Sequence, residues 1–575
     1  MLIGLMGRLL AAHKGTVLAI VVLQLVQTVA NLLLPTLNAA IIDDGIVTGN
    51  VPAILSLGSW MAAIAVVQVA AAAAAGYLGA VVAMELGRQL REELFAKVQL
   101  MSSQEVGVFG AASLVTRATN DVAQIQNLAV LVFTMLVAAP AIFIGGIVLA
   151  VHQDVALSGI VVAVIPVLAV IMFLIVRRLV PLYRQGQELI DRISRVLREQ
   201  IIGANVIRGF VRQGHEIRRF AVANRALTQN NLRSALLVAG MMPVIMLVVN
   251  LSSVAVVWFG GHRIQSGEMR LGALTAFIAY ILQILIAIMM AMYVFMTAPR
   301  AAACAERVQA VLDTAPAITD GPGAAAPAGN AVEFRNVSFA YPGAEAPVLD
   351  NITFTAVPGT VTAVIGATGS GKTTLLNLLP RFLAATGGGI SIGGCDVRDL
   401  PLDTLRSLVA VVPQHAYLFS GTLAGNLRMA APAATDGELW RVLEAVQAED
   451  FVRKLPQGLE SPVSQGGTNF SGGQRQRLCI ARALLREAPV YLFDDSFSAL
   501  DYGTDLRLRE AIGPLLSTAT VLIVAERIAT IVDAGLILVL EDGRLVAQGT
   551  HHDLMDSSPS YQEIAASQLV LEETL

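Results

Sequence analysis

The stretch that decides the fold of the second half of this 575-residue chain is Gly366-Ala367-Thr368-Gly369-Ser370-Gly371-Lys372-Thr373-Thr374. It follows an apolar, β-rich run at 361–365 and opens a helical pattern at 373–382. In this G-x-x-x-x-G-K-[ST] arrangement, backbone N–H groups surround phosphates, the lysine reaches the β- and γ-oxygens, and the next hydroxyl binds Mg²⁺. The sequence therefore predicts that ATP and Mg²⁺ bind to this phosphate loop (residues 366–374).

Further β-rich runs follow the phosphate loop and alternate with helical patterns. The runs lie at 408–412, 490–493 and 521–524, and a second clear helical pattern covers 474–486. This alternation indicates an α/β domain with a mainly parallel central sheet. We therefore expect a P-loop NTPase domain of the α/β class.

A Ser-Gly-Gly-Gln motif and an acidic strand end also lie in this domain. The motif is Phe470-Ser471-Gly472-Gly473-Gln474, and the apolar run 490–493 ends in Asp494-Asp495. A Ser-Gly-Gly can simply be a flexible turn. At a helix N-terminus, however, two glycines leave backbone N–H groups open to a phosphate, and the helix dipole favours the anion.

The first half of the chain carries six stretches without Asp, Glu, Lys or Arg. Each exceeds the roughly 20 apolar residues that cross a hydrocarbon core of about 30 Å. The stretches are 15–42, 51–84, 122–153, 155–176, 234–261 and 271–299. A buried core helix could explain one such run, but six in series predict six membrane spans.

Basic residues set the expected orientation, because Lys and Arg are retained on the cytoplasmic side. Segments 85–121 and 177–233 are rich in arginine, whereas 43–50 has none, and Arg263 and Arg270 are mild exceptions. We expect two long cytoplasmic loops and both termini in the cytoplasm. The first apolar run is too long for a cleavable signal peptide.

An Ala-, Pro- and Gly-rich segment separates the two halves. We predict a transmembrane domain over 1–313, a linker over 314–330 and an ATP-binding domain over 331–575. The three cysteines have no metal-site spacing, and we read them as packed thiols. A net charge of −4 gives no indication of nucleic acid binding.

The combination resembles ATP-binding cassette (ABC) transporters, specifically half-transporters with the six-span exporter-type fold. The resemblance implies that Tyr341 stacks on adenine, that Gln414 contacts Mg²⁺ and that Asp494 binds Mg²⁺. It also implies that a loop ending in Asp501 crosses a dimer interface, in which each ATP lies between one chain's phosphate loop and the other's Ser-Gly-Gly-Gln motif. One copy of each per chain then predicts a dimer. Segments 109–121 and 206–220 resemble the family's coupling regions.

Two positions depart from the family pattern, both next to the site of hydrolysis. Asp495 stands where Glu is usual, and its carboxylate is about one methylene farther from the attacking water, where roughly 1 Å matters. Glu526 stands where His is usual, and a carboxylate cannot donate to the γ-phosphate and is repelled by it. With Gln414, these are the candidate catalytic residues. They predict ATP binding with slow turnover.

Because the Ser-Gly-Gly-Gln motif is intact, we favour a heterodimer in which this chain completes an active site on a second ABC half-transporter. A homodimer with slow ATPase keeps the same architecture. An importer of siderophores or lipids, or an ATP-gated channel or regulatory subunit, are further alternatives.

The charge-free spans argue against a strongly charged substrate. The polar side chains in them more often form interhelical hydrogen bonds than a binding site; they are Gln24, Gln27, Asn31, Gln68, Asn250 and Gln283. We expect a lipophilic drug or a lipid, moved outward, with membrane lipids around the spans. Arginine over lysine and Ala, Val and Gly richness indicate a high-GC bacterium, and the chain resembles actinobacterial multidrug-type half-transporters of the plasma membrane.

Overall fold

The computed structural model describes residues 4, 7, 13–323 and 327–572. It divides into two compact units: Met1–Lys97 with Ala112–Asp313, and Val98–Ala111 with Thr314–Leu575. Residues 324–326 of the predicted linker lie outside the described residues, as do residues 1–3, 5–6, 8–12 and 573–575 of the predicted domains.

The first unit is built from long apolar helices. Its helical elements are α2 (Lys14–Ala40), η1 (Ile41–Ile46), α3 (Val51–Gln99), α5 (Ala111–Thr116), η2 (Arg117–Asp121), α6 (Val122–Leu131), η3 (Val132–Leu136), α7 (Ala138–Gln153), α8 (Val155–Ile202), α9 (Ala204–Gly209), α10 (Gln213–Gln265) and α11 (Leu271–Leu312). Six continuous helical stretches among the described residues are long and apolar enough to cross a membrane. The prediction of six apolar helices is therefore confirmed.

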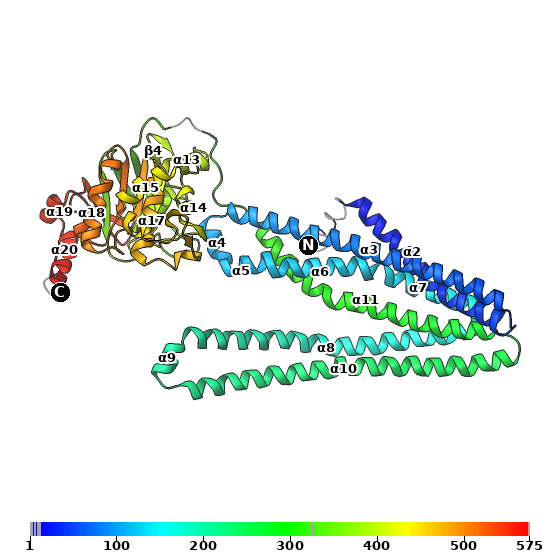
Figure 1. The fold of residues 1–575 in the computed structure, drawn as a ribbon. Helices are drawn as coiled ribbons and strands as arrows, with labels where there is room; N and C mark the ends of the chain where they lie inside the picture. The colour runs from blue at the N-terminus through cyan, green and yellow to red at the C-terminus, as the bar shows by residue number, and fades with distance from the viewer. Residues whose placement is uncertain (1–3, 5–6, 8–12, 324–326, 573–575) are drawn as a thin grey trace. The chain divides into compact units, whose positions relative to one another are not determined.

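The helices of this unit run well past the length of a membrane span. At 1.5 Å per residue, α8 is about 70 Å long, more than twice a hydrocarbon core. It packs along α10, and the short helix α9 joins the two at one end (Figure 1). The helix α11 packs on α2 and α7 around Phe277 and Tyr280, both fully buried.

Two ion pairs involve charges that flank the apolar stretches. Asp121, at the end of the π-helical segment η2, is buried and accepts hydrogen bonds from Arg307 Nε and Nη2 at 2.8 and 2.6 Å. Arg263, an exception in the arginine distribution, lies 3.0 Å from the Asp154 carboxylate. A paired arginine tolerates a half-buried position better than a free one.

The second unit is an α/β domain preceded in sequence by a short helix, α4 (Ser103–Phe109). Its strands are β1 (Val332–Phe339), β2 (Leu349–Ala356), β3 (Val361–Gly366), β4 (Gly387–Ile392), β5 (Cys395–Asp396), β6 (Val409–Val412), β7 (Gly421–Thr422), β8 (Pro462–Val463), β9 (Val490–Asp494), β10 (Thr520–Val524), β11 (Leu536–Glu541) and β12 (Arg544–Gly549). The other α-helices are α12 (Lys372–Leu378), α13 (Leu402–Leu408), α14 (Leu423–Arg428), α15 (Asp436–Ala445), α16 (Glu449–Arg453), α17 (Gly472–Leu484), α18 (Tyr502–Ile512), α19 (His551–Ser557) and α20 (Pro559–Glu572).

The central sheet has the order β12-β11-β3-β10-β9-β6, and every neighbouring pair is parallel except β11 with β12. This confirms the predicted, mainly parallel sheet. A second, antiparallel sheet with the order β2-β1-β4-β5 is not foreseen by the alternation of runs and helices. The predicted helix 373–382 ends early, at Leu378, because Pro380 has no N–H to donate to the next helical hydrogen bond.

The register of the central sheet positions the functional loops. Val524 pairs with both Asp494 and Val364, and Val412 pairs with Phe493. Because these strands are parallel, their carboxyl ends lie at one edge, where ligands of open α/β sheets bind. The phosphate loop, Asp494-Asp495, Glu526 and Gln414 all follow strands at this edge.

Candidate functional site

The phosphate loop turns from β3 into α12 through glycines that no larger residue could replace. A Cβ at Gly366 would lie 2.0 Å from the Leu540 carbonyl oxygen. Gly371 has φ 100°, in the left-handed region, and caps the N-terminus of α12. The loop therefore presents its backbone N–H groups at a helix N-terminus, an arrangement that favours phosphate.

Lys372 folds back onto the phosphate loop. Its Nζ donates to the carbonyl oxygens of Gly366 and Ala367 at 2.8 and 2.9 Å. Burial lowers the pKa of Lys372, and the carboxylates of Glu526, Asp495 and Asp494 oppose that shift. Three carboxylates thus act on one ammonium group, which gives this site an excess of negative charge.

Thr373 and Asp494 form the candidate metal site. Thr373 Oγ1 donates to Asp494 Oδ1 at 2.9 Å. Burial raises the pKa of Asp494, and the hydrogen bond from Thr373 opposes the shift. Nearby, the buried Ser370 Oγ has no partner among the described residues. These oxygen atoms, with the exposed Gln414 two residues past β6, fit the hard ligands that Mg²⁺ prefers.

Asp495 and Glu526 follow neighbouring strands, and the charge of each carboxylate opposes the lowering of the Lys372 pKa. Asp495 has φ 45°, a left-handed conformation that Asp tolerates better than most residues, and its N–H donates to the Val524 carbonyl at 3.0 Å. Glu526 is exposed. The structure therefore brings together the two residues that depart from the family pattern.

Tyr341 follows β1 by two residues and lies beside Thr374, the last residue of the phosphate loop. Its hydroxyl is 3.4 Å from Thr374 Oγ1, and its ring packs edge-on against Phe339 at 4.9 Å. The residue is 42% exposed. A half-exposed ring in contact with Phe339 is compatible with stacking on a planar base.

The Ser-Gly-Gly-Gln motif forms the N-terminus of α17. Ser471 Oγ accepts from the Gln474 N–H at 3.3 Å, and Gln474 Oε1 accepts from the Ser471 N–H at 2.9 Å, so the two form a capping box. The motif's serine and first glycine are exposed. Across the described chain, no hydrogen bond or ion pair joins residues 471–474 to the phosphate loop.

The loop before α18 packs beside this motif. A Cβ at Gly473 would lie 3.3 Å from the Ala499 carbonyl oxygen. Asp501 caps α18 by accepting from the Thr504 N–H at 3.0 Å, and the hydrogen bonds from Thr504 lower the pKa of Asp501. In this structure Asp501 therefore serves its own helix.

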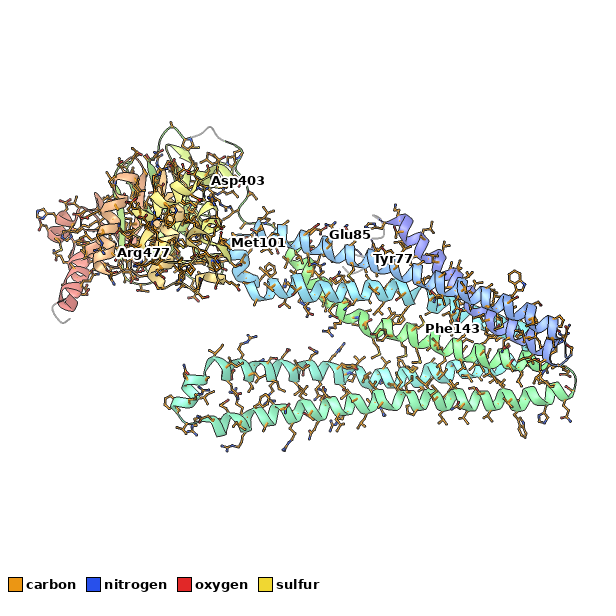
Figure 2. The ribbon with its side chains drawn as sticks, viewed as in Figure 1. Tyr77, Glu85, Met101, Phe143, Asp403 and Arg477 are labelled. Atoms are coloured by element: carbon orange, nitrogen blue, oxygen red, sulfur yellow. The ribbon has the colours of Figure 1, made fainter. Side chains whose placement is uncertain are left out.

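Two residues that the sequence does not single out also belong to these elements. Arg477 on α17 (Figure 2) lies 5.2 Å over the Phe451 ring. Burial lowers the pKa of Arg477, and Asp501 opposes that shift. Gln568 on α20 hydrogen-bonds to the backbone on both sides of residue 527. No sequence signal predicts the second contact, since the partners are some 40 residues apart.

Comparison with known proteins gives consistent matches along the chain. Residues 17–289 match the family model of the ABC transporter transmembrane region, and residues 349–498 match the family model named ABC transporter. An uncharacterised ABC transporter ATP-binding protein of Mycobacterium bovis is 43% identical, covering 99% of this chain and 98% of that protein. The ATP-dependent lipid A-core flippase of Chromobacterium violaceum is 32% identical, covering 84% and 83%.

A solved structure, that of a bacterial Atm1-family ABC exporter with ATP bound, has the same fold. It superimposes with a TM-score of 0.79 at 23% identity, covering 97% of this chain and 99% of that chain.

Proposed function

This chain belongs to the ABC transporters, and from that premise we propose that it is one subunit of a heterodimeric exporter whose own ATP site turns over slowly. Family membership gives the coarser facts. The protein is an integral inner-membrane transporter with a cytosolic ATPase domain, and ATP hydrolysis drives transport. The proposal concerns which site hydrolyses ATP and what is transported.

The observation that carries the proposal is that Asp495 and Glu526 follow the neighbouring parallel strands β9 and β10 at one edge of the sheet, and the charges of both oppose the lowered pKa of Lys372. A carboxylate at 526 repels the γ-phosphate and lacks a proton to donate. The Asp495 carboxylate stops about one methylene short of where a glutamate would hold the attacking water. ATP would bind to the phosphate loop and persist there.

Mg²⁺ would be held by Thr373, Asp494 and Gln414, and when bound it neutralises phosphate charge. Thr373 and Asp494 already contact each other. The Mg²⁺ ligands are thus intact, so we propose that ATP still binds, weakened only by the charge of Glu526, and that the main defect lies in turnover.

The Ser-Gly-Gly-Gln motif supports a role on the other nucleotide. It is capped and preorganised, and nothing lies within 4 Å of a Cβ built at Gly472. Its open N–H groups suit a phosphate held by a second chain. We propose that the partner is another half-transporter that carries Glu and His at the positions of Asp495 and Glu526.

For the substrate we propose a lipid or a lipophilic drug, moved outward. The name of one relative refers to lipid A-core. Three of the polar span residues bond to each other: Gln68 Nε2 donates to Asn31 Oδ1 at 3.2 Å, and Gln283 Nε2 donates to the Asn31 carbonyl at 3.1 Å. These amides tie α2, α3 and α11 together, so these three polar side chains serve helix packing.

The test compares one substitution in the Ser-Gly-Gly-Gln motif with one in the phosphate loop. The chain is co-purified with its partner in lipid nanodiscs. Gly472→Asp places a carboxylate in the first turn of α17, where the helix dipole tolerates it but a phosphate does not. Lys372→Ala disables the chain's own phosphate loop. Gly437→Asp, an exposed position in the first turn of α15, is the matched control.

We expect Gly472→Asp to reduce ATP turnover by about 100-fold, Lys372→Ala to reduce it only a few-fold, and Gly437→Asp to leave it unchanged. Equal losses from the first two variants would contradict the asymmetric heterodimer. Fast turnover by this chain purified without a partner would favour the homodimer instead.

A further inference from the structure

We infer that Gln568 is a positioning residue for the nucleotide site, acting through the loop that carries Glu526. Its side-chain Nε2 donates to the Glu526 carbonyl oxygen at 2.6 Å, and its Oε1 accepts from the Ile528 N–H at 2.8 Å. One amide thus holds the backbone before and after residue 527. We call this pair of hydrogen bonds the Gln568 clamp.

The clamp is placed by packing elsewhere on the same helix. Tyr561 on α20 is fully buried, and Ala565 is buried one turn later. The Tyr561 hydroxyl lies 2.8 Å from His551 Nδ1, which ties α20 to α19. Because the helix is docked through Tyr561 and Ala565, the position of Gln568 one turn further on follows from the fold.

The loop is tied at its other end by the central sheet. The Ala525 N–H donates at 3.2 Å to the carbonyl oxygen of Val364, two residues before the phosphate loop. Glu526 therefore sits between two fixed points, a sheet contact on one side and the Gln568 clamp on the other. Its backbone is fixed although its side chain is exposed.

A fixed backbone holds the Glu526 carboxylate within electrostatic reach of Lys372. In the proposed function, on which this inference rests, Lys372 binds the terminal phosphate of ATP. The carboxylate should oppose ATP more than ADP, because only ATP carries the γ-phosphate. Releasing the clamp lets the loop move away and reduces that repulsion. General loosening of the domain would instead weaken ATP and ADP binding alike.

The experiment uses Gln568→Ala in the full-length chain in lipid nanodiscs. Gln562→Ala is the matched control, because Gln562 Nε2 also donates to a backbone carbonyl, that of Met555 at 2.6 Å, from the same helix. Two quantities are measured: hydrogen exchange of the Ile528 amide, and the ratio of the Kd values for radiolabelled ADP and ATP.

We expect Gln568→Ala to speed exchange of the Ile528 amide about fivefold, and to raise the ratio of the ADP Kd to the ATP Kd about threefold. Both effects are small because a single hydrogen bond makes only a modest net contribution to stability. Gln562→Ala should change neither. Gln568→Glu, which keeps the acceptor for Ile528 but not the donor to Glu526, should give an intermediate exchange rate. In a Glu526→Gln background, Gln568→Ala should no longer change the Kd ratio.

Unchanged exchange in Gln568→Ala would overturn the inference, and so would faster exchange with an unaltered Kd ratio. Either result leaves the proposed slow site untouched, since that proposal is judged by turnover. If instead exchange and ratio change as expected, but replacing Asp495 and Glu526 by Glu and His does not speed turnover, the inference stands and the slow-site proposal fails.

Discussion

Replacing Asp495 by Glu and Glu526 by His, together, should restore fast hydrolysis at this chain's phosphate loop. The two carboxylates follow neighbouring strands and both act on Lys372. Each replacement corrects a different departure from the family pattern in the proposed slow site. The first moves a carboxylate outward toward the attacking water, and the second removes a charge that opposes the γ-phosphate.

The rate gain expected from Asp495→Glu follows from the longer side chain of glutamate. A methylene extends the carboxylate by roughly 1 Å, and misplacement on that scale changes rates by roughly 100-fold. Part of this gain is lost, because residue 495 has φ 45° and a glutamate tolerates that backbone less well than an aspartate. At about 1 kcal/mol the strain reduces the gain about fivefold, which leaves roughly 20-fold for Asp495→Glu.

The rate gain expected from Glu526→His follows from removal of the negative charge at position 526. Two like charges about 4 Å apart repel by about 4 kcal/mol near a protein surface. Glu526 is exposed, so water reduces the repulsion, and we use about 1.4 kcal/mol, or tenfold in rate. If the two effects are additive, the double variant should turn over about 200-fold faster than the unaltered site.

The assay is phosphate release by the full-length chain with its partner in lipid nanodiscs, with Gly472→Asp in this chain to suppress the partner's site. Asp542→Glu is the matched control. Asp542 is exposed, also has φ 45°, and lies in the turn between β11 and β12. The same substitution on the same backbone, away from the nucleotide, should leave turnover unchanged.

No increase in the double variant beyond that of Asp542→Glu would refute the reasoning. The slow-site proposal would also fail if the unaltered chain, with Gly472→Asp, already hydrolysed ATP as fast as the double variant. An increase in Asp495→Glu alone, without a further gain from Glu526→His, would assign the defect to reach and not to charge.

Three further results are expected. Arg307→Ala should destabilise the first unit by about 2 kcal/mol, because it leaves the buried Asp121 carboxylate unpaired while Arg307 itself is half exposed. Adding Asp121→Asn to this variant should restore part of the lost stability, as measured by thermal unfolding. Burial lowers the pKa of Lys372, so the folded chain binds fewer protons than the unfolded chain between that lowered pKa and 10.5. The free energy of unfolding should therefore rise with pH across this window. Lys372→Met should remove the rise, and a fall in the unaltered chain would contradict the prediction. Ser471→Ala should cost about 1 kcal/mol of stability through loss of the cap on α17, whereas Gly472→Asp should not, and equal unfolding temperatures for the two variants would show that the cap is unimportant.

The sequence predicts the parts of this protein that depend on local pattern. The six apolar helices follow from runs without charged residues, and the parallel sheet follows from β-rich runs alternating with helices. It does not predict the antiparallel sheet of β1, β2, β4 and β5, because its pairing is set by contacts between strands that periodicity does not reveal.

The candidate site divides along the same line. Sequence alone determined the phosphate loop, because a fixed spacing of glycines, lysine and threonine is enough to specify phosphate chemistry. The resemblance to a known family, and not spacing, drew attention to the Ser-Gly-Gly-Gln motif, Asp495 and Glu526. Only the tertiary structure decided that the two carboxylates act on Lys372, that Asp495 has a left-handed backbone, and that Gln568 holds the loop of Glu526. These relations join segments far apart in the chain, and their geometry is set by strand register and helix docking rather than by any local pattern of residues.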